Sequence, residues 1–455
     1  MNRREFIKLL SIGGFTLANL SLAKEQNKPN IIFILTDDLG YGDLSCYGGA
    51  DLETPHIDNI ASSGIKFRNF YANCPVCSPT RASVLTGMYP DLVGVPGVIR
   101  THITNSFGYL SPHAVLLPEV LKSEGYETAI IGKWHLGLES PNTPNDHGFD
   151  HFHGFLGDMM DDYYTHRRHD INYMRLNMDE IDPKGHATEL FTEWSVDYIK
   201  EKSRSDKPFF LYLAYNAPHS PIQPPEEWLM RVKQRNPNMD DKRAKIVALI
   251  EHLDDAVGRV VNAVDESGLS EDTLIMFVSD NGGDIPAGAS NAPLHGGKGQ
   301  MFEGGINVPA CAMWKNHIPT GLVSERVLLT MDVFPTVCEV ADAEFSHEIN
   351  GLSFLDTLLG QNNAKYDDRF LFWMRREGGL RYGGQAFYAS RYKNWKLLQN
   401  TPFEPLKLYN LGNDPNEQNP LDENSEEYRM LFNELQKHII RSGAVAWQKY
   451  PVNIP

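Results

Sequence analysis

The chain has 455 residues, of which 41% are hydrophobic and 22% are charged. This length is enough for one large α/β domain with a buried core plus a smaller companion, and the composition excludes disordered, collagen-like and solenoid proteins. The formal net charge of −17 argues against nucleic acid as a partner, because binding to phosphates requires a basic surface.

The first 23 residues have the pattern of a signal peptide. A basic start is followed by an apolar run from Leu9 to Leu22 and then by the small residue Ala23. Arg3 and Arg4 resemble the twin-arginine export signal, although Asn2 stands where that signal usually has Ser or Thr. The apolar run is too short and too polar for a stable anchor, and no later segment is typical of a transmembrane helix. We therefore expect residues 1–23 to be removed from a periplasmic or secreted protein that does not insert stably into the membrane.

Four short apolar runs, rich in β-branched and aromatic residues, predict buried strands at Asn30–Thr36, Thr128–Ile131, Phe209–Leu213 and Thr273–Val278. Between the last two, apolar residues from Ile246 to Val264 recur at helical spacing, and Gly268 then closes the segment. Strands alternating with helices predict an α/β fold with a large central mixed, mostly parallel sheet flanked by helices.

The character of the chain changes after about residue 365. Aromatic and basic runs predict short strands at Phe370–Arg375, Asn394–Leu398 and Leu408–Asn410, and Glu426–Ile440 predicts an amphipathic helix. We therefore expect a large domain over residues 24–365 and a smaller C-terminal α+β domain over residues 366–455, carrying a short antiparallel sheet.

Polar residues follow each of the four strands predicted in the large domain. Because the carboxyl ends of strands form the ligand crevice of an open α/β sheet, we expect these side chains to converge. The acidic members need a cation to neutralise them, and an all-oxygen set suits Ca²⁺ or Mg²⁺ rather than zinc. For either acidic pair alone, the alternative is an ordinary helix cap or turn. In chain order the residues are Asp37 and Asp38, Lys133 and His135, His219, and Asp280 and Asn281.

Two of the five cysteines lie in Cys74-Pro75-Val76-Cys77. This spacing is compatible with a redox motif or with half of a zinc site, but a thioredoxin-like pattern and a second ligand pair are both missing from the sequence. From Cys77 the chain reads Cys-Ser-Pro-Thr-Arg, and Leu-Thr-Gly follows at residues 85–87. This run resembles the signature of the sulfatase family, Cys-x-Pro-x-Arg followed by Leu-Thr-Gly, in which the cysteine is oxidised to formylglycine.

The resemblance extends from about Asn30 to Pro309, and more weakly to Leu408-Tyr409-Asn410. It covers the motifs Gly132-Lys133-Trp134-His135, Ala217-Pro218-His219 and Gly296-Gly297-Lys298-Gly299. The resemblance implies an alkaline-phosphatase-like fold, with residues 24–365 as the catalytic domain of a hydrolase that cleaves an organic sulfate ester. It also implies one bound Ca²⁺, with Mg²⁺ as the second choice, and a formylglycine-generating enzyme as a maturation partner.

The same resemblance assigns roles to individual residues. The cation is held by Asp37, Asp38, Asp280, Asn281 and the formylglycine made from Cys77. Hydrated formylglycine attacks sulfur with Asp280 as base, His219 or Lys298 protonates the leaving alcohol, and His135 then assists the release of sulfate. The catalytic set is thus Cys77, Arg81, Lys133, His135, His219 and Lys298.

For an exported member of the family, the resemblance favours a sulfated polysaccharide or oligosaccharide as substrate, and ulvan, carrageenan and chondroitin-like chains are all open. Candidate substrate-binding residues are Arg100, His102, His147, Arg375 and Arg376, together with segment 163–169, although such residues are more often solvated loop positions. The chief alternative is a phosphonate or phosphodiester hydrolase of the same superfamily, which the Cys-Ser-Pro-Thr-Arg run disfavours. A non-catalytic glycan-binding relative should have lost the nucleophile or metal ligands, and none is lost here.

Overall fold

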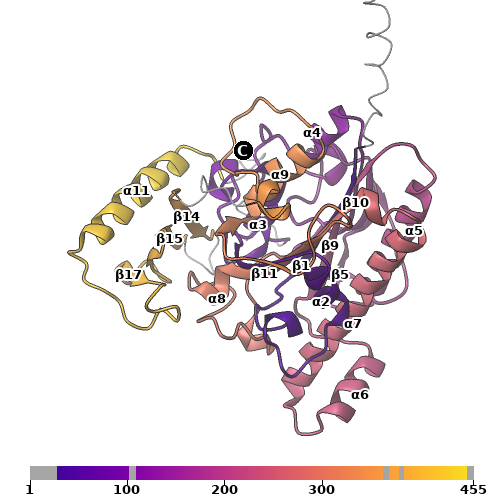
Figure 1. The fold of residues 1–455 in the computed structure, drawn as a ribbon, viewed down its shortest axis with the longest axis horizontal. Helices are drawn as coiled ribbons and strands as arrows, with labels where there is room; N and C mark the ends of the chain where they lie inside the picture. Colours follow the sequence, from indigo (N-terminus) through magenta and orange to yellow (C-terminus); the bar gives the residue numbers. More distant parts are fainter. Residues whose placement is uncertain (1–27, 102–108, 362–367, 379–383, 448–455) are drawn as a thin grey trace, which may run out of the picture.

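The computed structural model describes residues 28–101, 109–361, 368–378 and 384–447 (Figure 1). The predicted signal peptide, residues 1–23, lies outside the described residues. None of the helices in the described ranges is both long enough and apolar enough to cross a bilayer.

A central sheet forms the core of the molecule, and its middle strands run parallel. Strands β10, β1, β9, β3 and β4 lie side by side in parallel, while β11 pairs antiparallel with both β10 and β2. The predicted mixed, mostly parallel sheet is therefore confirmed. The strands are, in sheet order, β12 (Leu322–Ser324), β2 (Ile65–Tyr71), β11 (Asn307–Met313), β10 (Thr273–Ser279), β1 (Asn30–Asp37), β9 (Phe209–Pro218), β3 (Glu127–Lys133), β4 (His151–Phe155), β7 (Met174–Leu176) and β8 (Asp179–Glu180), with β13 (Leu328–Leu329) also pairing with β2.

The four strands expected in the large domain all form, because each is a run of apolar residues that the helices on both faces can cover. Every residue of β1, β9 and β10 is buried. Strand β1 holds the centre of the sheet, with Leu35 opposite Val278 on one side and opposite Ala214 on the other. A strand flanked on both edges and covered on both faces has little freedom to shift, so the residue at its end is held in a fixed place.

Helices cover both faces of the sheet (Figure 1). Helix α7 packs on α2, α5, α6 and β9 on one face, whereas α3, α4 and α9 pack together on the other. Helix α7 contains the predicted segment 246–264 and is capped by Asp240, which accepts hydrogen bonds from two backbone amides. The helices are α2 (Pro55–Ser62), α3 (Cys77–Thr86), α4 (Leu117–Ser123), α5 (Ala187–Lys202), α6 (Glu226–Arg235), α7 (Asp241–Glu266), α8 (Glu303–Ile306), α9 (Val333–Val340) and α10 (Leu355–Leu358), with 3-10 turns at Ser45–Tyr47, Pro90–Val93, Pro144–His147, Ser270–Asp272, Ile285–Ala287 and Thr330–Asp332.

A four-stranded antiparallel sheet and one long helix make up the C-terminal part, as predicted. Its strands are β14 (Leu371–Arg376), β15 (Ala386–Tyr392), β16 (Trp395–Leu398) and β17 (Lys407–Asn410), in that order. Helix α11 (Glu426–Gly443) packs on β15 and β16. Strand β15 was not expected from the sequence, and a two-stranded ribbon, β5 (Arg167–Arg168) with β6 (Ile171–Asn172), lies apart from both sheets. The domain boundary at residue 365 stays a prediction.

The carboxyl ends of the central strands carry the polar residues picked out in the sequence. Asp37 is the last residue of β1 and Lys133 the last of β3, while His219 and Asp280 directly follow β9 and β10. Because these four strands are neighbours and run parallel, their ends meet at one edge of the sheet.

Candidate active site

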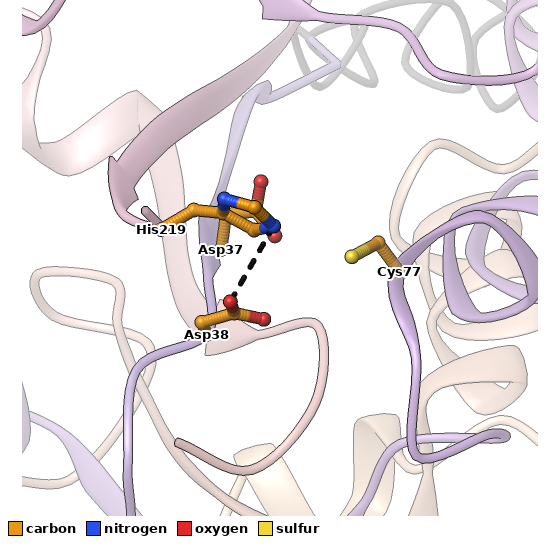
Figure 2. Close-up of side chains that lie close together, drawn as sticks. All are labelled: Asp37, Asp38, Cys77 and His219. Carbon is orange, nitrogen blue, oxygen red and sulfur yellow. Dashed lines mark ion pairs between the residues drawn. The ribbon is translucent and has the colours of Figure 1, made fainter. Parts of the chain in front are cut away.

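A compact polar cluster lies where helix α3 begins opposite the ends of the central strands. The carboxylate oxygens of Asp37 and Asp38, the Cys77 sulfur and a ring nitrogen of His219 all lie within 4.8 Å of one another. Figure 2 shows the Cys77 side chain pointing from the start of α3 towards Asp37 and His219. These residues lie on separate strands and loops along the chain, and the fold brings them together.

Three buried carboxylates in this cluster each face a cation. Lys133 Nζ lies 2.5 Å from Asp37 Oδ2, and Lys298 Nζ lies 2.6 Å from Asp38 Oδ2. The guanidinium of Arg81 donates two hydrogen bonds to Asp280 Oδ2, at 2.8 and 3.2 Å. Three acidic side chains therefore each face a cation, which is the condition for burying such groups.

Two oxygen acceptors in the cluster remain unused. Asp37 Oδ1 and Asn281 Oδ1 are buried and accept no hydrogen bond from any described residue. Asp38 Oδ1 lies beside them, accepting from Asn281 Nδ2 at 2.8 Å. Unpartnered buried oxygens are costly, and oxygen-only donor sets are those that Ca²⁺ and Mg²⁺ prefer, so these residues fit a hard divalent cation.

The backbone at Asp38 supports this view. Its φ angle is +67°, in the left-handed region that residues other than glycine rarely adopt. Such strain persists only where surrounding structure enforces it, and it is common at ligand-binding sites. Here Asp38 N donates to Asp280 Oδ1 at 3.2 Å, which ties the two acidic loops together.

The carboxylates differ in proton affinity. Burial alone would raise the pKa of Asp37, but Lys133, His219 and Arg81 hold it well below its ordinary value. For Asp280, burial and the nearby charge of Asp37 together raise the pKa to about 7. In the cation-free protein, Asp37 is thus the firmly ionised member of the pair.

His135 is held as a neutral hydrogen-bond acceptor. Its Nε2 donates to the Ile99 carbonyl at 2.7 Å, so Nδ1 carries the lone pair, and it meets no partner among the described residues. Burial, then Lys133 and Arg81, lower its pKa well below the usual range. Ser78 Oγ accepts from the amide of Ile99 at 3.0 Å and so fixes the carbonyl that orients this ring. This supporting role of Ser78 was not foreseen from the sequence.

His219 is also held neutral, with the opposite tautomer. Its Nδ1 donates to the Ser220 carbonyl at 2.6 Å, and its Nε2 accepts from Lys298 Nζ at 3.1 Å. Burial and the Lys298 charge lower its pKa, whereas Asp38 raises that of Lys298 against the effect of burial. The buried Tyr163 hydroxyl lies 2.9 Å from the His219 carbonyl and 2.8 Å from that of Asn216. Tyr163, which belongs to the segment expected to contact substrate, also supports the His219 backbone.

The two cysteines of the C-x-x-C run have different surroundings. Cys77 faces the cluster, whereas the fully buried Cys74 donates its S–H to the Met374 carbonyl at 3.3 Å. All five cysteines lie within the described residues, and none is in a disulfide. Burial and the Asp37 charge raise the pKa of Cys77 well above its usual value, which disfavours an unmodified thiolate as the nucleophile.

The residues expected to contact substrate have mixed surroundings. Arg100 and Arg375 meet at the buried Glu377, at 3.1 and 3.0 Å, and Arg375 also donates to the Gly299 carbonyl at 3.0 Å. Arg376 lies 4.6 Å above the ring of Trp447.

His147 is buried against Trp134, and its Nδ1 lies 3.8 Å from Glu119 Oε1. His102 lies outside the described residues. The substrate-binding roles stay predictions.

Comparison with known proteins gives consistent matches. The sulfatase family model matches residues 29–343, and a model for the C-terminal part of N-sulphoglucosamine sulphohydrolase matches residues 296–444. N-acetylgalactosamine-6-sulfatase of Sus scrofa is 31% identical over 457 residues, covering 90% of this chain and 85% of that protein. Arylsulfatase A of Homo sapiens is 31% identical over 450 residues, covering 88% of this chain and 84% of that protein.

A solved structure of Ps i-CgsB in complex with k-i-k-neocarrahexaose superposes with a TM-score of 0.84. It is 29% identical and covers 93% of this chain and 95% of its own. The structural likeness therefore extends over both the central sheet and the C-terminal part.

Proposed function

The chain belongs to the sulfatase family and is a sulfatase, and from this premise we propose that it removes sulfate from a sulfated carbohydrate, using a formylglycine made from Cys77 and one Ca²⁺. The observation that carries the proposal is the position of Cys77. Its side chain, and not that of Cys74, faces the buried acidic cluster with the unused oxygens.

Asp37, Asp38, Asp280 and Asn281 would hold the cation, together with the oxidised side chain at position 77. With both groups in place, the site gains a nucleophilic hydroxyl at that position and a Lewis acid beside it. Because each of the three acidic side chains already faces a cation of the protein, a site holding a divalent cation would carry an excess of positive charge. That excess favours an anionic sulfate ester over a neutral ester.

The chain's own cations then act on the sulfate. With their carboxylate partners neutralised, the ammonium groups of Lys133 and Lys298 are available to bind sulfate oxygens. Arg81, which donates twice to Asp280, orients that carboxylate as the base for the attacking hydroxyl.

Proton transfer to the leaving alcohol is assigned to Lys298. The tautomer of His219 supports this choice, because its Nε2 accepts a hydrogen bond from Lys298 and therefore has no proton to give. His219 instead aligns the ammonium group. His135 has a free Nδ1 lone pair, which suits a base that assists the release of sulfate from residue 77.

Two relatives support a carbohydrate sulfate as the substrate class. The name of N-acetylgalactosamine-6-sulfatase indicates a sulfated sugar as its substrate, and the structure of Ps i-CgsB was solved in complex with a neocarrahexaose. We extend the substrate class, but not the particular sugar, to this chain. Arg100, Arg375 and Arg376 remain the candidate contacts for the glycan.

The alternative of a phosphonate or phosphodiester hydrolase is tested by direct comparison. Turnover of 4-nitrophenyl sulfate should exceed that of 4-nitrophenyl phosphate and of bis(4-nitrophenyl) phosphate by orders of magnitude. The reverse ranking would favour the alternative.

The mature protein is proposed to act outside the cytoplasm after loss of residues 1–23, and to require a formylglycine-generating enzyme in its host. The basic start and apolar run of this segment support export.

Mass spectrometry of active enzyme tests the proposal. The tryptic peptide Asn69–Arg81 should carry an aldehyde at position 77 and an ordinary cysteine at position 74. Cys77→Ala should fold and lose turnover, and Cys77→Ser should be nearly as inactive, unless the host also oxidises serine. Full activity with unmodified Cys77 would overturn the mechanism and favour a redox or thiol role for Cys74 and Cys77.

A further inference from the structure

The segment that carries Lys298, residues 297–303 and here called the Lys298 loop, lies between the central sheet and the C-terminal sheet. On the side of the large domain, the amide of Lys298 donates to the Gly283 carbonyl at 3.1 Å, and that of Gly299 to the Pro75 carbonyl at 2.8 Å. These bonds link the loop to the segments after β10 and before α3.

On the opposite side, three side chains of the C-terminal part each hold one backbone group of the loop. Asn400 Oδ1 accepts from the amide of Met301 at 2.5 Å, and Glu417 Oε2 accepts from the amide of Glu303 at 2.7 Å. Arg375 donates to the carbonyl of Gly299, as described above. The loop backbone is therefore bound from both sides.

Buried charges strengthen this contact. Lys396 of β16 is fully buried, and its Nζ lies 2.8 Å from Glu303 Oε1 and 2.7 Å from Glu417 Oε1. The second oxygen of Glu303 accepts from the Tyr71 hydroxyl at 2.5 Å. Two neighbouring carboxylates are costly to bury without a compensating cation, so Lys396, which contacts both, stabilises the contact between Glu303 and Glu417.

The loop needs such support because of its own composition. Lys298 stands between two glycines, and Gly299 has a φ angle of +86°. A Cβ at Gly299 would lie 2.6 Å from Nη1 of Arg375, so the close approach of this arginine depends on glycine. Glycines leave the backbone free to move, while a proton donor must be held in place to within a fraction of an ångström.

We propose that the C-terminal sheet positions Lys298 for catalysis, with Asn400 and Glu417 fixing the backbone of the Lys298 loop and Lys396 fixing Glu417 and Glu303. The proposal rests on the proposed function, in which Lys298 protonates the leaving alcohol. Asn400, Glu417 and Lys396 are positioning residues, because they act through the loop. Arg375, which remains a candidate contact for the glycan, also holds the loop backbone through the Gly299 carbonyl.

The test uses Asn400→Ala and Lys396→Met in the full mature chain, with Asn410→Ala as a matched control. Asn410 Oδ1 also accepts one backbone amide in the C-terminal part, that of Gly412, but does not contact the loop. Two substrates are compared. 4-nitrophenyl sulfate has a good leaving group, whereas phenyl sulfate has a more basic leaving oxygen, so its cleavage depends more strongly on protonation by the enzyme. Lys298→Ala provides the reference pattern.

A mispositioned Lys298 should lower kcat for phenyl sulfate by about tenfold or more and for 4-nitrophenyl sulfate by much less. We expect Asn400→Ala and Lys396→Met to show this unequal loss and Asn410→Ala to show none. Hydrogen exchange of the peptide spanning residues 297–303 should be faster in the first two variants and unchanged in the control.

Equal losses on both substrates, or unchanged exchange in the loop, would overturn the positioning proposal. Formylglycine content and thermal unfolding are measured on every variant, so that a maturation or folding defect is recognised separately. Failure of wild-type enzyme to turn over either sulfate would count against the proposed function, and full activity of Lys298→Ala would count against the assignment of Lys298 as proton donor. The exchange data would then still show whether the C-terminal sheet holds the loop.

Discussion

Replacing Lys133 by methionine should destabilise the protein far more than replacing a lysine of a surface ion pair. Lys133 is fully buried, and its ammonium group is the nearest counter-charge of the equally buried Asp37. Removing one partner of such a pair leaves an uncompensated charge in the interior, which typically costs about 3–5 kcal/mol. Arg81 remains 3.7 Å from Asp37, so we expect the low end of this range, about 3 kcal/mol.

The free energy of unfolding is measured by urea denaturation in the presence of a chelator, which keeps divalent cations out of the site. The matched control is Lys122→Met, because Lys122 pairs with Asp150 on the surface with side chains 54% and 40% exposed. Loss of that exposed pair should cost no more than about 1 kcal/mol.

A double variant separates the charge effect from packing. Adding Asp37→Asn to Lys133→Met removes the orphaned charge, so much of the lost stability should return. The reasoning is refuted if Lys133→Met costs no more than Lys122→Met, or if the second substitution only adds to the loss.

Three further outcomes are expected. Chelation should abolish turnover, with loss of the metal followed by elemental analysis. Ca²⁺ at a hundred times its Kd should then raise the free energy of unfolding of the wild type by about 2.7 kcal/mol, followed by thermal unfolding, but should not stabilise Asp37→Ala. Burial and His252 lower the pKa of the buried His186 from 6.5 to about 4, so its contribution to stability is complete above pH 6.5 and is lost as the pH falls towards 4. Urea titrations should show that the free energy of unfolding of the wild type falls by about 3 kcal/mol over this pH window, and that it falls less in His186→Gln. The same pH dependence in both proteins would contradict the assignment to His186. N-terminal sequencing of protein from the native host should find cleavage near Ala23, and uncleaved cytosolic protein would argue against export.

The sequence alone predicts most of the residues that make up the candidate site. Asp37, Lys133, His219 and Asp280 each stand at or just after a buried apolar run, and a parallel arrangement of those runs makes the ends converge. Their grouping could therefore be predicted from local patterns alone. Their individual roles remain predictions, to be tested by the variants above.

The supporting contacts could not be predicted in this way. Ser78 acts on His135 through the backbone of Ile99, and Tyr163 acts on His219 through two carbonyl groups. Such contacts depend on where a carbonyl or amide lies in space, and any residue type supplies those groups. No sequence motif marks them.

The local sequence determined the four buried strands and the long helix of the large domain, and which charged groups stand at the strand ends. The spacing of apolar residues, the apolar content of a run and the capping residues each act over a few positions, so they can be recognised in the sequence. Only the tertiary structure decided that β11 enters the sheet antiparallel, that Cys77 and not Cys74 faces the carboxylates, and that Arg375 and Lys396 hold the Lys298 loop. These outcomes join residues up to hundreds of positions apart, and they follow from the need to pair every buried charge and hydrogen-bonding group at once, which is a property of the whole packed chain.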